Sequence, residues 1–152
     1  MSKEVAKGVP LNGLDLSGKH ALVTGGGTGL GRQMADALAE AGARVTICGR
    51  RAAPLKAAAE TAVAAGRDIR WTVTDVTNPS DRRKLFDTVK DVDILVNNAA
   101  LGERKPWLTV TVDEWRAIMN LNLEAPFERS QLFFPPMVEK KWGRWINIVA
   151  GC

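Results

Sequence analysis

The 152-residue sequence has no tyrosine, one histidine and only two cysteines. Cys48 and Cys152 are too few and too far apart for a disulfide framework or a zinc site, so no metal site is predicted. No apolar run approaches the roughly 20 residues that span a bilayer, and the opening MSKEVAKGVPLNG lacks the apolar stretch of a signal peptide. We therefore expect a cytoplasmic protein without a membrane partner.

The sequence also lacks a strong excess of charge. Its net charge is +4, and its 45% hydrophobic and 25% charged residues are ordinary for a globular protein. The dense basic positions are residues 50–51, 82–84 and 140–141, and they do not form the basic face of a nucleic-acid binder. The last two groups are typical of solvated helix surfaces. We predict no nucleic-acid partner and a single domain over residues 1–152.

Five short segments are rich in β-branched residues and almost continuously apolar, a pattern typical of parallel strands covered on both faces. They are residues 20–25, 43–49, 69–73, 93–98 and 145–149. The predicted helices are residues 30–41, residues 52–65, a helix capped by Asn78, and a long helix at roughly residues 112–138 that follows a capping box at Thr111. Strands that alternate with helices predict an α/β fold with a doubly wound parallel sheet.

The segment TGGGTGLG, residues 24–31, joins the first predicted strand to the first predicted helix. In a dinucleotide-binding turn, the first glycine permits the tight turn, the second permits close approach of the pyrophosphate, and the third permits close packing of the helix. The free N–H groups of the helix would bind the phosphates, and the absence of a following lysine excludes a P-loop. This context favours dinucleotide binding over a plain turn. The predicted contacts are Gly25, Gly27, Thr28, Gly29, Leu30 and Gly31.

The end of the second predicted strand discriminates between the two nicotinamide dinucleotides. NAD-binding proteins carry an acidic residue there, about 20 residues past the glycine turn, which binds the ribose 2′-hydroxyl. This sequence instead has CGRR, which places Arg50 and Arg51 at that position. Because a cation suits a 2′-phosphate, the predicted cofactor is NADP, with NAD as the alternative. The competing interpretation is an exposed arginine pair that binds nothing.

The sequence resembles the short-chain dehydrogenase/reductase family. The resemblance rests on TGGGTGLG, on DVT at residues 75–77 and on NNAA at residues 97–100, which occur in the order typical of the family. It runs from about residue 14 to the end and implies a Rossmann-type fold with seven strands, of which five are present. The resemblance implies cofactor contacts at Asp75, Val76, Asn98 and Ala99. Asn97 is expected to be structural, and Ala100 replaces a glycine of the family motif.

The stretch MNLNLEAPF is similar to the fourth-helix segment of the family and places its active-site asparagine at Asn122. An α-helical carbonyl at Asn122 would accept a hydrogen bond from the N–H of residue 126, which is proline and has none. Pro126 therefore frees this carbonyl and predicts a kink. The resemblance implies that the carbonyl holds a water molecule in a proton relay. The alternative is an incidental proline kink.

In the family, a strand like residues 145–149 is followed by an active-site serine and then by Tyr-x-x-x-Lys, whose tyrosine transfers a proton at the substrate oxygen. Aligned without gaps, Ala150 occupies the serine position; if two residues have been lost before VAG, the serine is missing. In either case no hydroxyl is supplied there, and the sequence has no tyrosine. The expectation is therefore the cofactor-binding part of an enzyme, incomplete at its C-terminus, which binds the cofactor without catalysing.

The parent activity that the resemblance implies is hydride transfer between NADP(H) and a carbonyl or alcohol substrate. The alternative is a non-catalytic dinucleotide-binding module that acts as a sensor or partner subunit. Subunits of the family pair through their long fourth and fifth helices. Together with the apolar residues 145–149, this implies a homo-oligomer or a complementing chain.

Overall fold

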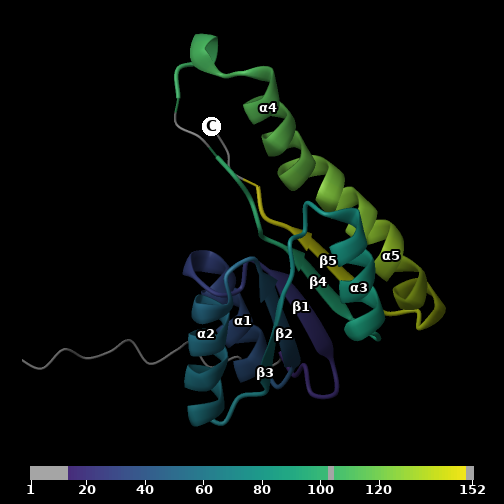
Figure 1. Cartoon of the computed structure of the whole chain (residues 1–152). Helices are drawn as coiled ribbons and strands as arrows, with labels where there is room; N and C mark the ends of the chain where they lie inside the picture. Colours follow the sequence, from purple (N-terminus) through teal and green to yellow (C-terminus); the bar gives the residue numbers. More distant parts are fainter. Residues whose placement is uncertain (1–13, 103–104, 150–152) are drawn as a thin grey trace, which may run out of the picture.

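The computed structural model describes residues 14–102 and 105–149 and shows a five-stranded sheet with helices on both faces (Figure 1). The strands are β1 (His20–Thr24), β2 (Arg44–Gly49), β3 (Ile69–Val73), β4 (Ile94–Asn97) and β5 (Arg144–Asn147). The helices are α1 (Gly29–Glu40), α2 (Ala52–Ala64), α3 (Pro79–Thr88), α4 (Val112–Met119) and α5 (Ala125–Glu139), with a 3-10 turn η1 (Trp107–Thr109) and a π-helical segment η2 (Asn120–Glu124). Ala150, at the predicted serine position, lies outside the described residues.

The sheet order is β3-β2-β1-β4-β5, and every neighbouring pair of strands is parallel. The chain builds outward from β1 to β3 and then crosses to the other side of β1 to form β4. This order confirms the predicted doubly wound α/β fold. The carboxyl ends of β1 and β4 meet at the point where the strand order reverses, which is where open α/β sheets bind ligands.

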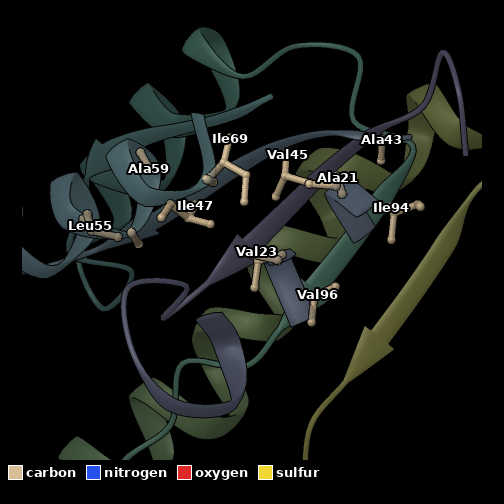
Figure 2. Close-up of a cluster of buried hydrophobic side chains, with 14 residues drawn as sticks. Ala21, Val23, Ala43, Val45, Ile47, Leu55, Ala59, Ile69, Ile94 and Val96 are labelled. Carbon is tan, nitrogen blue, oxygen red and sulfur yellow. The ribbon is translucent and has the colours of Figure 1, made fainter. Parts of the chain in front are cut away.

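Alternate side chains of the central strands pack into two apolar clusters, one on each face of the sheet. Figure 2 shows the cluster under α1 and α2, in which Val23, Val45 and Ile47 contact Leu55 and small alanines of the two helices. On the opposite face, Leu22 and its neighbours pack against Leu85, Phe133 and Met137 from α3 and α5. The alanines of α1 and α2 allow these helices to lie close to the sheet.

The two outer strands differ from the prediction that all strands are covered on both faces. In β3, the side chains of Trp71 and Val73 are exposed, and every residue of β5 is exposed, including Trp145 and Ile146. Each of these strands has only one neighbour in the described sheet, so one edge of each is open. The continuous apolar pattern therefore predicted the strands correctly and their burial wrongly.

The predicted caps of α3 and α4 are confirmed by their side-chain hydrogen bonds. The side chain of Asn78 accepts from the N–H of Ser80 at 2.9 Å, and Thr111 and Glu114 form the reciprocal capping box of α4. The predicted long helix consists of α4, η2 and α5 in succession, and α4 extends beyond the sheet (Figure 1). Among the described residues, no helix combines the length and the apolar character needed to cross a bilayer.

A buried ion pair joins α3 to α5. The guanidinium of Arg82 is fully buried; its Nε donates to Glu128 at 2.9 Å, and its Nη1 donates to the carbonyl of Val76 at 2.8 Å. One arginine therefore connects the helix α5 to the segment that follows β3. Because a buried charge without a partner is strongly unfavourable, this pair should contribute measurably to stability.

Replacing Glu128 with glutamine should lower the free energy of unfolding by about 2 kcal/mol, because buried Arg82 keeps its charge and loses its carboxylate partner. Urea unfolding at constant pH and salt measures the change. The control is Glu60→Gln, which removes a carboxylate from the exposed pair with Lys56 and should change stability by less than about 0.5 kcal/mol. Equal effects of the two substitutions would contradict the assigned role of Arg82.

Candidate functional site

A cavity of about 310 Å³ lies at the carboxyl ends of the central strands. The residues that line it are Gly25, Gly27, Thr28, Leu30, Gly31, Gly49, Arg50, Arg51, Pro54, Leu55, Thr74, Asp75, Val76, Thr77, Asn98, Ala99, Ala100 and Leu121. They come from the turns after β1, β2, β3 and β4 and from η2. The cavity thus contains every predicted cofactor contact except Gly29.

The glycine turn is shaped by contacts that exclude larger side chains. Gly25 has a φ of +69°, and its N–H donates to the carbonyl of Cys48 at 2.8 Å, which turns the chain out of β1. A Cβ on Gly31 would collide with the carbonyl of Gly25 and the side-chain amide of Asn98. The predicted close packing at Gly31 is therefore present between α1 and the end of β4.

Gly29 is the one predicted cofactor contact that does not line the cavity. A Cβ there would meet no atom of the protein within 4 Å, so its approach to a pyrophosphate stays a prediction. Its φ of +54° is a separate reason for glycine, because α1 begins here with a residue in the left-handed region. Thr28 precedes it as the N-cap without a side-chain hydrogen bond, so the first N–H groups of α1 remain available to an anion.

Two exposed arginines form the cavity wall after β2. Arg50 follows the strand, and Arg51 is the N-cap residue of α2. Among the described residues, no acidic side chain lines the cavity at the end of this strand, where the other lining residue is Gly49. The arrangement places two cations beside the open N-terminus of α1. This side of the cavity is therefore suited to phosphate groups.

The opposite wall follows β3. Oδ1 of Asp75 accepts from the N–H and the hydroxyl of Thr77, at 2.9 and 2.7 Å, and these bonds hold the pKa of Asp75 below its usual value, with smaller contributions from the charges of Arg50 and Arg82. Asp75 is therefore ionised at neutral pH. The backbone of Val76 beside it is held by the hydrogen bond from Arg82.

Thr24 connects the glycine turn to the segment after β4, a role that the sequence prediction missed. Its buried hydroxyl accepts from the N–H groups of Asn98 and Ala99, each at 3.0 Å, and donates to the carbonyl of Val96 at 3.3 Å. The side-chain amide of Asn98 donates in turn to the carbonyl of Thr24 at 2.9 Å. Thr24 is the first residue of TGGGTGLG, so its position in the motif is the signal that could have identified it.

Asn122, the predicted catalytic residue, lies next to the cavity edge without lining it. Its Oδ1 accepts from the N–H of Leu101 at 2.9 Å, and its Nδ2 donates to the Leu101 carbonyl at 2.8 Å. The π-helical segment η2 lies directly before Ala125 and Pro126. At its end, the N–H of Ala125 bonds to the carbonyl of Asn120, one residue further back than in an α-helix. The expected disturbance at Pro126 therefore takes the form of a wider turn, where a kink was predicted.

Within the part of the chain that the structure describes, the cavity offers binding groups and no proton donor suited to neutral pH. Its ionisable lining residues are Arg50, Arg51 and Asp75. The nearby thiol of Cys48 is completely buried, which raises its pKa to about 12 and keeps it protonated. Among the described residues, no cluster of three His, Cys, Asp or Glu side chains is placed to hold a metal ion.

Comparison with known proteins places this geometry in a family. The model of the family described as short chain dehydrogenase matches residues 19–151. A tropinone reductase homolog of Arabidopsis thaliana is 39% identical over 125 residues, which are 79% of this chain and 47% of the homolog. An NADP-dependent (R)-specific alcohol dehydrogenase of Lentilactobacillus kefiri is 37% identical over 133 residues, which are 84% of this chain and 52% of that enzyme.

The fold has close counterparts among solved structures. A gluconate 5-dehydrogenase from Burkholderia cenocepacia, solved with NADP and tartrate, superposes with a TM-score of 0.80 at 33% identity, covering 90% of this chain and 55% of that one. This chain spans about half the length of these similar proteins. The family match covers nearly all of the described sheet and cavity, and the chain therefore belongs to the short-chain dehydrogenase/reductase family.

Proposed function

We propose that this chain is the NADP(H)-binding part of an oxidoreductase that transfers a hydride between the cofactor and a carbonyl or alcohol substrate. One observation carries the cofactor assignment: the open N-terminus of α1 and the arginine pair after β2 line the same cavity. Two of the similar proteins are described with NADP, the alcohol dehydrogenase and the gluconate 5-dehydrogenase, and this supports the choice over NAD.

The residues of the cavity fit the parts of such a cofactor. The first turn of α1 and the glycine turn would bind the pyrophosphate, and Arg50 and Arg51 would bind the 2′-phosphate. Asp75, ionised and held by Thr77, would accept a hydrogen bond from the adenine amino group, with Val76 and Asn98 beside it. NADPH, when bound, supplies the hydride.

The 152-residue chain by itself is proposed to bind without catalysing. Reduction of a carbonyl needs a proton at the substrate oxygen, and the sequence contains no tyrosine to supply it. Asn122, held on Leu101, would contribute its backbone carbonyl to a proton relay. A non-catalytic sensor or partner subunit would use the same cofactor site and would likewise show no turnover.

The chain is also proposed to associate, with a second copy or with a complementing chain. Apolar side chains along α4, η2 and α5 are exposed, and we call them together the outer helix face. It consists of Val112, Trp115, Leu123, Phe127, Phe134 and Val138. The edge of β5 lies beside it, because the rings of Phe134 and Trp145 are 6.1 Å apart. Surfaces of this kind are uncommon on monomers.

NADPH should bind roughly tenfold to a hundredfold more tightly than NADH, because the 2′-phosphate gains charge-assisted hydrogen bonds from the arginine pair. Arg50→Asp should reverse this order, since it repels the phosphate and accepts from the ribose hydroxyl. Isothermal titration with both cofactors measures the two affinities. The control is Arg83→Asp, the same charge change on the exposed face of α3, which should preserve the preference. An unchanged preference in Arg50→Asp would disprove the assignment.

The chain should not oxidise NADPH with a panel of ketones and aldehydes, or reduce NADP with alcohols, above the rate without protein. A general acid commonly contributes about 10²–10⁴-fold in rate, and the cavity offers none. The absorbance of NADPH, followed in a sample whose intact mass matches 152 residues, provides the measurement. Cofactor-dependent turnover by that sample would show that another group donates the proton.

Sedimentation at micromolar concentration should show an associated species. Phe127→Lys and Trp145→Lys should shift the distribution toward the monomer, because each places a charge on the apolar surface of α5 or β5. The matched control is Val63→Lys on α2, where the side chain is 62% exposed and the helix packs on the opposite face of the sheet from α5. A stable, cooperatively unfolding monomer would contradict the proposed association.

A further inference from the structure

Arg129 on α5 is completely buried, yet most of its hydrogen-bonding capacity is unused. Its Nε donates to Oδ1 of Asn97 at 3.0 Å, whereas Nη1 and Nη2 have no partner among the described residues. The adjacent carboxylate, Glu128, is already paired with Arg82. Burial lowers the pKa of Arg129 to about 10, so the side chain is still charged at neutral pH.

Such an arrangement does not favour stability. A buried cation with two unpaired nitrogens is disfavoured relative to an apolar side chain of similar size. The hydrogen bond of Arg129 to Asn97 is the one that its side chain makes among the described residues, and we therefore look for its role there. Asn97 is 4% exposed, is the last residue of β4, and lies directly before Asn98 and Ala99 in the cavity wall.

The contact decides which way the Asn97 amide faces. A guanidinium has only donors, so the Asn97 oxygen must point to Arg129 and its NH₂ group must point away. That NH₂ group donates to Oδ1 of Asn147 on β5 at 2.9 Å. At the same point, the carbonyl of Asn97 accepts from the N–H of Ile148 at 2.9 Å. A chain of hydrogen bonds therefore runs from α5 through β4 to β5.

We propose that Arg129 is a positioning residue of the cofactor site. By orienting Asn97, it holds the end of β4 against β5, and so fixes the backbone that continues into Asn98 and Ala99. The inference rests on the proposed function, because the segment it positions is the wall assigned to the cofactor. It predicts that the loss of Arg129 weakens cofactor binding without weakening the fold.

The test is the variant Arg129→Met, which retains the length of the side chain and removes its donors. Its dissociation constant for NADPH should rise roughly tenfold, the effect expected when a charge-assisted hydrogen bond is lost. Its urea midpoint should stay equal to that of the parent or rise, because a buried charge has been removed. Arg129→Lys, which keeps a donor-only group, should bind within about threefold of the parent.

Two further variants make the result decisive. Asn147→Ala removes the far end of the hydrogen-bond chain from an exposed position on β5, and it should weaken NADPH binding by about threefold while the fold is retained. Ser130→Ala is the matched control, because this serine is the next residue of α5 and its hydroxyl, among the described residues, bonds only to the carbonyl of Pro126. It should leave the dissociation constant unchanged.

These measurements distinguish a failure of the inference about Arg129 from a failure of the proposed function. Unchanged NADPH binding in both Arg129→Met and Asn147→Ala would overturn the inference and leave the proposed function standing. Parallel loss of affinity and stability, or failure of Arg129→Met to fold, would identify a structural residue and would also overturn it. A parent chain that binds no NADPH would overturn the proposed function and the inference together.

Discussion

The site depends on one buried hydroxyl. Thr24 ends β1, where the order of the strands reverses, and it binds the backbone of the segment after β4 through two N–H groups. The glycine turn and the wall at Asn98 are thereby held at a constant separation. Gly31 can approach this junction only because it has no side chain, which brings the N-terminus of α1 to the same place. A dinucleotide site needs this convergence because its phosphates bind backbone groups.

Charge is distributed unevenly around this junction. The exposed arginines after β2 face the cavity, whereas Arg82 and Arg129 are buried on the α3/α5 face of the sheet. The exposed pair can act on an anion, while the buried pair acts on the protein itself. Arg82 joins α3, α5 and the backbone of Val76, and Arg129 orients the amide of Asn97. The exposed arginines are thus free to meet an anion in the cavity, whereas the buried arginines hold the backbone segments that form its walls.

The surface of the chain is apolar at both edges of the sheet. Both β3 and β5 expose apolar side chains, Trp71 of β3 beside Val63 of α2 and Trp145 of β5 beside Phe134 of α5. The π-helical segment η2 lies within that helix and directs Asn122 to the backbone of Leu101. One long helix therefore presents an unpartnered surface on one side and contacts the edge of the cofactor cavity on the other.

The sequence by itself determined the order of strands and helices, the helix caps and eleven of the eighteen residues that line the cavity. These features are local: β-branched runs, capping residues such as Asn78 and a glycine turn restrict the backbone near themselves. Their convergence could be predicted because parallel strands bring their carboxyl ends to one edge of the sheet. The family resemblance supplied the contacts after β3 and β4, and the family itself is confirmed.

Only the tertiary structure decided which strands are covered and which polar side chains meet. The patterns of β3 and β5 resemble those of the central strands, because an apolar run does not encode how many neighbours a strand has. The contacts of Thr24 with Asn98, and of Arg129 with Asn97, join residues that are 74 and 32 positions apart in the sequence. No local pattern specifies such a pair, since each hydrogen bond exists only after strands and helices have packed.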